Sequence, residues 1–146
     1  MPIVKKILKH KLLLDTHIWI WLMNEDQIFS PSFRSTVDRI SDQGGILISP
    51  ISIWEVGMLV EKKRISIDMD CMDWVQKALS APGVSIAPIT PRIAIQSCRL
   101  PGHIHGDPAD RLLLATAHEE NAVLVTCDEK LLKYGKENFA FLHDPR

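Results

Sequence analysis

The chain alternates between short apolar runs and longer stretches in which apolar residues recur at helical spacing. Three of the apolar runs show no polar alternation, which is typical of strands buried on both faces of a parallel sheet. Turn or capping residues bound each run. The predicted strands are Lys11–Asp15, Ile46–Ser49, Val84–Pro88, Ala122–Thr126 and Phe139–Leu142.

Helices are predicted between these strands, and their starts are well marked. A capping residue stands before a proline at the first helical position, a combination that favours helix initiation. The three starts of this kind are Ser30-Pro31, Thr90-Pro91 and Asp107-Pro108. Gly44-Gly45 is expected to end the helix that begins near Pro31, and Asp70 to Leu79 has helical spacing. Strands alternating with helices predict an α/β fold with a mostly parallel central sheet.

Four widely separated acids stand where apolar runs give way to turns or helix starts. Asp15 and Asp128 end predicted strands, whereas Glu55 and Asp110 lie in the first turns of predicted helices. In parallel α/β sheets the ligand crevice lies outside the carboxyl ends of the strands. We therefore expect the four carboxylates to converge at one edge of the sheet.

Converging carboxylates repel one another, and some take up protons near neutral pH unless a cation is present. A ligand set made of oxygen without cysteine favours Mg²⁺ or Mn²⁺ over Zn²⁺. A carboxylate-held ion of this kind suits phosphoryl chemistry, in which a metal-activated water attacks phosphorus. The acids therefore indicate a metal site and make a phosphodiester a reasonable substrate.

Each acid also has a purely structural interpretation. Ser52-x-x-Glu55 matches a capping box, Asp107 an N-cap with Asp110 as its third-position partner, and Asp128 a cap of the short helix that follows it. Asp15 is harder to explain in this way, because an acid directly after three leucines is not an evident cap.

Several further side chains have a structural and a functional interpretation. The Thr126 hydroxyl could orient a metal ligand or a water. Arg111 could hold a phosphate or the site acids, or be an exposed helix arginine. His17, two residues after Asp15, could reach the site or cap the next helix.

Aromatic and basic residues are interpreted without a nucleic-acid role. Core or dimer contacts are favoured over base-stacking platforms for the four tryptophans. These are Trp19, Trp21, Trp54 and Trp74. The short basic stretch Lys62-Lys63-Arg64 is interpreted as solvated surface.

Composition narrows the class of protein. The 146 residues, 46% hydrophobic and 24% charged, fit one ordinary globular domain. A formal net charge of −1 excludes a basic field over the whole molecule, although a local patch remains compatible with nucleic acid.

Three widely spaced cysteines without a C-x-x-C pair predict neither a disulfide framework nor a zinc ribbon. With no apolar run near the ~18 residues that span a bilayer, we expect a cytoplasmic protein without membrane contact.

Four motifs carry a resemblance to a known family. Leu13-Leu14-Asp15-Thr16-His17 resembles the opening of PIN-domain proteins of the VapC toxin type. Three later motifs are similar to the ones that follow in that family. They are Ser49-x-x-Ser52-Ile53-Trp54-Glu55, Asp107-Pro108-Ala109-Asp110-Arg111 and Leu124-Val125-Thr126-Cys127-Asp128. The match runs in the correct order over roughly residues 11 to 142.

The resemblance implies a PIN-like three-layer α/β/α sandwich over residues 11–146, preceded by an N-terminal extension at residues 1–10. It further implies Mg²⁺- or Mn²⁺-dependent endoribonuclease activity in a toxin of a type II toxin–antitoxin pair. An RNA substrate, a small VapB-like or similar cognate antitoxin and a homodimer are the implied partners.

The resemblance also assigns roles to residues. Asp15, Glu55, Asp110 and Asp128 carry over as an acidic quartet for catalysis and metal binding. Asp15 and Asp110 would be the most direct ligands, while the other two complete the shell through water or by positioning the nucleophile. The possible supporting residues are Thr16, Asp107, Arg111 and Thr126. The third motif departs from the common family pattern, which has arginine and phenylalanine where this chain has Gly106 and Ala109.

Two other functions are compatible with these residues. One is a catalytically inert PIN-like module that binds RNA or an antitoxin; it is disfavoured because none of the four acids is replaced. The other is a metal-dependent phosphatase. Asp15-Thr16-His17 counts against its usual aspartyl-phosphate route, because His17 stands where the second acid belongs.

Overall fold

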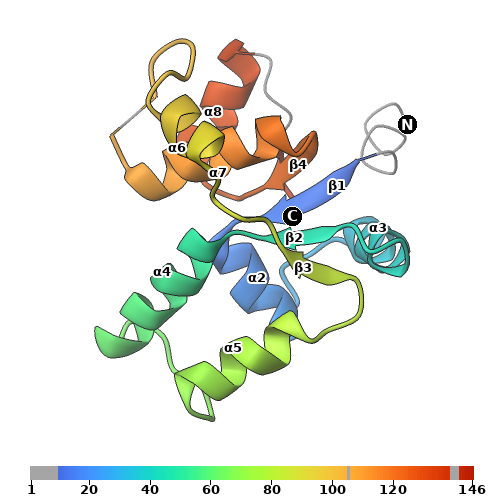
Figure 1. Ribbon diagram of the computed structural model, residues 1–146. Helices are drawn as coiled ribbons and strands as arrows, with labels where there is room; N and C mark the ends of the chain where they lie inside the picture. The colour runs from blue at the N-terminus through green and yellow to red at the C-terminus, as the bar shows by residue number, and fades with distance from the viewer. Residues whose placement is uncertain (1–9, 105, 139–141) are drawn as a thin grey trace.

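The apolar runs pair into a five-stranded parallel sheet in the computed structural model, which describes residues 10–104, 106–138 and 142–146. The strand order is β3-β2-β1-β4-β5 (Figure 1). The strands are β1 (Lys11–Leu14), β2 (Ile46–Ile48), β3 (Val84–Ile86), β4 (Ala122–Val125) and β5 (Leu142–His143). The α/β fold with a parallel sheet is thus confirmed.

Two sequence predictions fall partly or wholly outside the described residues. The predicted last strand, Phe139–Leu142, includes 139–141, which are not described; β5 comprises Leu142 and His143. The predicted N-terminal extension, residues 1–10, lies outside them except for His10.

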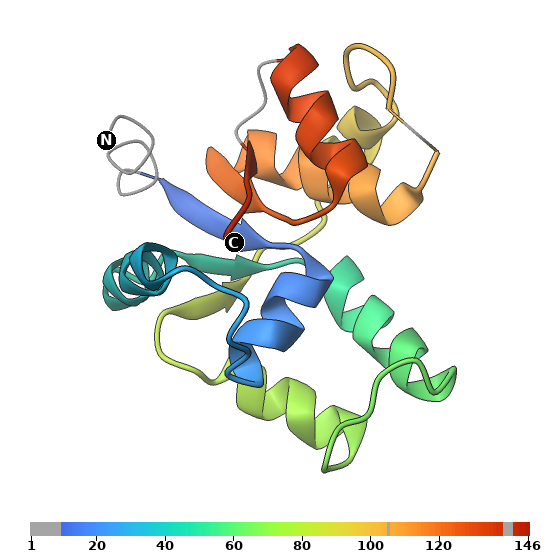
Figure 2. The ribbon, with the colours of Figure 1, turned by 180° about the vertical axis from the view of Figure 1, so that it is seen from behind.

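Helices cover both faces of the sheet, as Figures 1 and 2 show from opposite sides. They are α2 (Thr16–Met23), α3 (Pro31–Asp42), α4 (Pro50–Glu61), α5 (Cys71–Leu79), α6 (Pro91–Ser97), α7 (Pro108–Glu119) and α8 (Glu129–Asn138). Helices α2 to α5 lie on one side of the sheet and α6 to α8 on the other, which makes a three-layer sandwich. Among the described residues, no helix is both long and apolar enough to cross a bilayer.

The pleat of the central strand divides the core into two layers. Leu12 and Leu14 belong to the apolar cluster under α2 to α5, whereas Leu13 belongs to the cluster under α7 and α8. All three leucines are at most 2% exposed. Strand β1 is therefore buried on both faces, which explains why its sequence shows no polar alternation.

The predicted capping residues begin their helices. Ser30 accepts a hydrogen bond from Phe33 N–H at 3.2 Å, Thr90 accepts one from Ile93 N–H at 3.2 Å, and Asp107 accepts one from Ala109 N–H at 2.9 Å. Gly44, with φ of 72°, follows the end of α3 as expected. These bonds satisfy N–H groups that have no partner within a helix.

The capping box predicted at Ser52 and Glu55 is wrong. Helix α4 begins three residues earlier, at Pro50, and its N-cap is Ser49, which accepts from Ile51 N–H at 3.2 Å. Ser49-Pro50 repeats the cap–proline pattern of the other starts. Glu55 consequently lies in the second turn of α4 instead of the first, and its side chain is directed by tertiary contacts.

Strand β1 lies at the topological switch point of the sheet. The chain first adds β2 and β3 on one side of β1 and then adds β4 and β5 on the other. Strand β1 pairs with β2 on one side and with β4 on the other, with Leu14 opposite Val125. Parallel sheets open a crevice at the carboxyl ends of such strands. The residues that follow, Asp15 after β1 and Thr126 after β4, therefore stand beside each other at that crevice.

Candidate active site

The centre of the candidate site is the Asp15 carboxylate at the end of β1. Asp15 Oδ1 accepts from Thr16 N–H at 2.7 Å, and Oδ2 accepts from the Thr126 hydroxyl at 2.7 Å. Asp15 is the N-cap of α2, so the expectation that it has no capping role is wrong. The bond to Thr126, across 111 positions of sequence, nevertheless has no part in capping and fixes the carboxylate across the crevice.

A second carboxylate joins this centre through the first residue of α2. The Thr16 hydroxyl donates to Glu55 Oε1 at 2.7 Å and is hydrogen bonded to the Ser52 hydroxyl at 3.0 Å. Thr16 and Ser52 are at most 1% exposed. Ser52 and Glu55 stand three positions apart on α4 and therefore share the face that meets α2.

The third acid, Asp128, is held from the β4 side. Its N–H donates to Thr126 Oγ1 at 3.0 Å, and its own Oδ1 accepts from Leu131 N–H at 3.0 Å. The predicted role of Asp128 as the cap of the following helix is therefore confirmed. Thr126 connects it to Asp15, because the same hydroxyl accepts from one residue and donates to the other.

The fourth acid, Asp110, lies in the first turn of α7. Burial and the negative charges of four acids raise its pKa from 3.8 to about 7. Those four acids are Asp107, Asp15, Asp128 and Glu55. The charges of these four acids therefore all act on Asp110 in the same direction.

The same mutual repulsion acts on two other members. Burial raises the pKa of Asp15, against its hydrogen bonds and nearby His17, and the charge of Asp128 raises it further. Burial likewise raises the pKa of Glu55, with Asp15 and Asp107 acting in the same direction and the Thr16 hydrogen bond against it. The site thus concentrates negative charge where solvation is reduced, which a cation would relieve.

The donor chemistry of these side chains fits a hard divalent cation. Carboxylate oxygens suit Mg²⁺ and Mn²⁺. The hydroxyls of Thr16 and Thr126 orient the carboxylates of Glu55 and Asp15, as residues that hydrogen bond to metal ligands commonly do. In the described part of the chain, however, no three histidine, cysteine or acidic side chains already surround a single point. The acids are nevertheless electrostatic neighbours, because the charges of Asp15, Asp128 and Glu55 all act on Asp110.

The remaining predicted residues divide into those near the acids and one directed elsewhere. Asp107 caps α7 and acts electrostatically on Glu55 and Asp110. The Arg111 guanidinium instead donates to the backbone carbonyls of Ser97 at 3.0 Å and Ile104 at 3.3 Å. These two bonds connect α7 to the end of α6 and to the segment between the two helices, and neither involves an acid.

Ser52 is the residue whose contribution the sequence interpretation missed. The capping-box interpretation gives it a purely local role, yet it is fully buried and hydrogen bonded to Thr16. The Ser49-Pro50 pair was the signal that could have found it, because a helix starting at Pro50 turns Ser52 and Glu55 to the same side.

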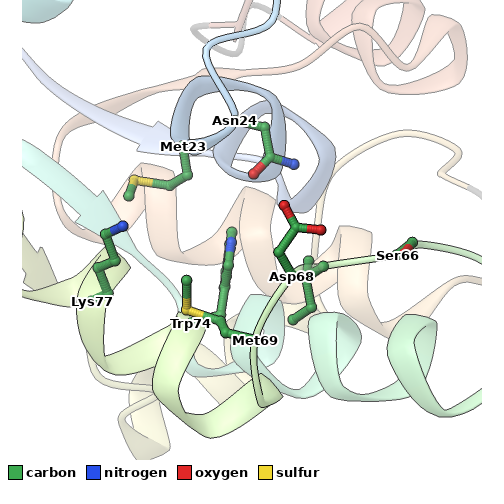
Figure 3. A pocket seen from close by; sticks show the side chains of 8 residues that line it. Met23, Asn24, Ser66, Asp68, Met69, Trp74 and Lys77 are labelled. Atoms are coloured by element: carbon green, nitrogen blue, oxygen red, sulfur yellow. The ribbon is translucent and has the colours of Figure 1, made fainter.

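A hollow elsewhere on the surface is separate from the acids. It has a volume of about 310 Å³ and lies between the end of α2, the segment before α5, and α5 itself (Figure 3). The side chains that line it include Met23, Asp68, Trp74 and Lys77. Since the acids lie at the opposite end of α2, this hollow is not part of the candidate site.

Comparison with known proteins places the chain in a family. The model of the PIN domain matches residues 12–137. The chain is 34% identical, over 119 residues, to Ribonuclease VapC22 of Mycobacterium tuberculosis (strain ATCC 25618 / H37Rv), a match that covers 82% of this chain and 88% of the relative.

Solved structures show the same fold. The crystal structure of VapBC2 from Rickettsia felis, bound to a DNA fragment from its promoter, contains a chain that superposes with a TM-score of 0.66 at 20% identity, covering 90% of this chain and 96% of that one. A toxin–antitoxin complex from Klebsiella pneumoniae gives a TM-score of 0.58 at 21% identity, covering 93% and 98%. The PIN-domain match covers most of the chain and the identity to VapC22 agrees with it, so the chain belongs to the PIN-domain family as one of its VapC proteins.

Proposed function

We propose that this protein is a metal-dependent endoribonuclease, the toxin of a type II toxin–antitoxin pair, that hydrolyses RNA phosphodiesters with a metal-activated water. The observation that carries the proposal is the pair of threonine hydrogen bonds that hold Asp15 and Glu55 at the crevice, and the raised pKa of Asp110, about 7, supports it. The name of the relative from Mycobacterium tuberculosis, Ribonuclease VapC22, supports a nuclease and gives the substrate class.

Each site residue has a distinct part in this proposal. Asp15 and Asp110 would hold Mg²⁺ or Mn²⁺, which when bound lowers the pKa of a water and stabilises the leaving oxygen. Glu55 and Asp128 complete the shell through water or position the nucleophile. Thr126 keeps Asp15 oriented through its 2.7 Å bond, and Thr16 does the same for Glu55.

The relatives support an antitoxin among the proposed partners. Both structural neighbours are toxin–antitoxin complexes, which supports a small VapB-like or similar antitoxin as the partner of this chain. A homodimer and a cytoplasmic location, where RNA and antitoxin are both present, complete the proposal.

Replacement of Asp15 tests the activity. Asp15→Asn keeps the size and the capping oxygen but removes the negative charge, so cleavage of a pool of structured RNAs with Mg²⁺ should fall by at least about 100-fold, since metal assistance is worth several kcal/mol. Asp73→Asn, an exposed acid in the first turn of α5, is the matched control and should cut normally. Circular dichroism verifies that both variants fold.

Metal removal is the complementary measurement. A chelator should abolish RNA cleavage by the unaltered protein, and Mg²⁺ or Mn²⁺ should restore it. Unchanged cleavage and toxicity in Asp15→Asn would refute the proposal. Absence of any heat on calorimetric titration with Mn²⁺ would instead support the inert binding module.

A further inference from the structure

The outer face of α4 exposes a large apolar side chain to solvent. Trp54 is 56% exposed, and only Ser52 and Val56 of this helix are buried. Trp54, Met58 and Lys62 are spaced four positions apart and form one row along the helix surface. We name these three residues the α4 ridge.

The ridge starts beside the candidate active site. Trp54 directly precedes Glu55, whose carboxylate is bonded to Thr16 at the crevice. From there α4 runs away from the edge of the sheet, as both ribbon views show (Figures 1 and 2). At 1.5 Å per residue, Lys62 lies about 12 Å farther along the helix than Trp54, a distance that a short single strand of nucleic acid can follow.

Positive charge gathers at the far end of the ridge. Lys62, Lys63 and Arg64 are all exposed and consecutive. Within the described residues, none of their side chains takes part in a hydrogen bond or ion pair. Glu61 is the acid next to them, so the segment 61–64 carries a net charge of +2 from three basic residues and one acid. This local charge contrasts with the net charge of −1 of the whole chain.

We infer that the α4 ridge, with Lys63 and Arg64 at its end, is a binding track for single-stranded RNA leading to the active site. A base next to the scissile phosphate stacks on the Trp54 indole, and phosphates farther along the same strand contact the basic residues. Strand-binding proteins combine these two elements, an aromatic platform and cations that follow the backbone. The inference rests on the proposed ribonuclease function and assigns a substrate-binding surface to it.

A protein partner fits the same face less well. A protein interface over the ridge and its end would remove the charges of Lys62, Lys63 and Arg64 from water. Desolvation of three like charges costs free energy. An RNA strand supplies an apolar face for Trp54 and negative charges for the cations. At 56% exposed, Trp54 is not a core residue, whereas Trp19 and Trp74, at 1% and 6% exposed, belong to the core.

The experiment measures RNA affinity by fluorescence anisotropy on the full chain. The probe is a labelled single-stranded RNA of about 12 nucleotides, within the usual footprint of such proteins. Asp15→Asn serves as the background so that the RNA is not cut. Trp54→Leu, which stays apolar but has no aromatic face, should bind about tenfold or more weakly, whereas Trp54→Phe should stay close to the parent. Met72→Ala removes an equally exposed side chain, 58% accessible, on α5 and should have no effect.

The charge at the end of the ridge is tested through the salt dependence of binding. Replacing Lys62 and Lys63 together by alanine removes two phosphate contacts, so the slope of log affinity against log salt should fall by about 1.4. Arg39→Ala, an exposed cation in the last turn of α3, should leave the slope unchanged. Sedimentation velocity on each protein determines its oligomeric state.

Two outcomes overturn the inference while leaving the ribonuclease intact. One is that Trp54→Leu in the Asp15→Asn background binds RNA as tightly as Asp15→Asn alone, while the unaltered protein, which retains Asp15, cuts RNA. The other is a fall in sedimenting mass in Trp54→Leu with the affinity per protomer unchanged, which would assign the ridge to a protein interface. If the unaltered protein cuts no RNA and Asp15→Asn binds none, the proposed function fails, and the inference fails with it.

Discussion

At the scale of single residues, the site is organised by threonine hydroxyls. Thr16 and Thr126 each donate to a carboxylate at 2.7 Å. A lysine or arginine in their place would neutralise Asp15 or Glu55 and compete with a cation. A hydroxyl fixes the direction of the carboxylate and leaves its negative charge available, so it suits a site that is to receive a metal ion.

The most informative residue to replace at this scale is Thr126. Thr126→Val keeps the buried shape but removes both the donor to Asp15 and the acceptor for Asp128 N–H. Loss of an orienting partner typically lowers metal affinity about 10–100-fold. We expect that decrease in calorimetric Mn²⁺ titration, with RNA cleavage lowered in proportion.

Two variants control this measurement. Thr126→Ser retains the hydroxyl and should bind Mn²⁺ nearly as the unaltered protein does. Thr116→Val removes a hydroxyl that is equally buried but bonded to the Leu112 carbonyl within α7. An equal loss of metal affinity in Thr116→Val would show that burial of valine, and not the bond to Asp15, causes the effect.

At the scale of elements, strands and most helix starts were predictable because they depend on neighbouring residues. The wholly apolar runs became parallel strands, and cap–proline pairs such as Ser30-Pro31 began helices. The start of α4 was misplaced because both Ser49 and Ser52 satisfy a capping pattern, and local sequence does not decide between them. Tertiary packing does, by burying Ser52 against Thr16.

The candidate site was predictable only in part, for the same reason. Its acids follow from strand ends, which the apolar pattern locates. Side-chain directions depend on contacts far apart in sequence, such as the bond between Thr126 and Asp15. The direction of Arg111, toward the carbonyls of Ser97 and Ile104, depends likewise on how α6 and α7 pack together.

The assignment of Ser49 as the cap of α4 leads to a stability prediction. Ser49→Ala removes the acceptor for Ile51 N–H at a fully buried position, so the free energy of unfolding should fall by about 1 kcal/mol. Denaturant unfolding measures the change. Ser35→Ala, at an exposed position inside α3, should be neutral or slightly stabilising. A neutral Ser49→Ala would contradict the start of α4 at Pro50.

At the scale of the whole molecule, charges of like sign are grouped, which lowers the stability of the fold and favours the binding of ligands of opposite charge. The net charge of −1 is the sum over a chain that has both an acidic crevice at the sheet edge and a basic segment at the end of α4. Gathering like charges destabilises a folded protein, and binding a cation in the folded state reverses the loss. The stability of the metal-free protein should therefore depend on pH through these acids.

Asp110 provides the last and most direct test. Its pKa is about 7 in the folded protein against 3.8 ordinarily, so between these values the folded state retains a proton that the unfolded chain releases. The free energy of unfolding therefore falls as pH rises through this window, and the loss is complete above pH 7. Burial raises the pKa of Asp15 and Glu55 in the same sense, whereas it lowers that of His143, which acts oppositely. Comparing Asp110→Asn with the unaltered protein cancels those contributions to first order.

In chelator, Asp110→Asn should melt at a higher temperature than the unaltered protein at pH 8, and the difference should disappear near pH 4. Solvent screening of a half-exposed carboxyl limits the gain to roughly 1–2 kcal/mol, or about 3–8 °C. Mg²⁺ should raise the melting temperature of the unaltered protein at pH 8 and that of Asp110→Asn much less, because the variant has no charge at this position to relieve. A variant that melts lower than the unaltered protein at pH 8 in chelator would show that Asp110 is stabilised by its neighbours, and would remove the electrostatic argument for a cation between them.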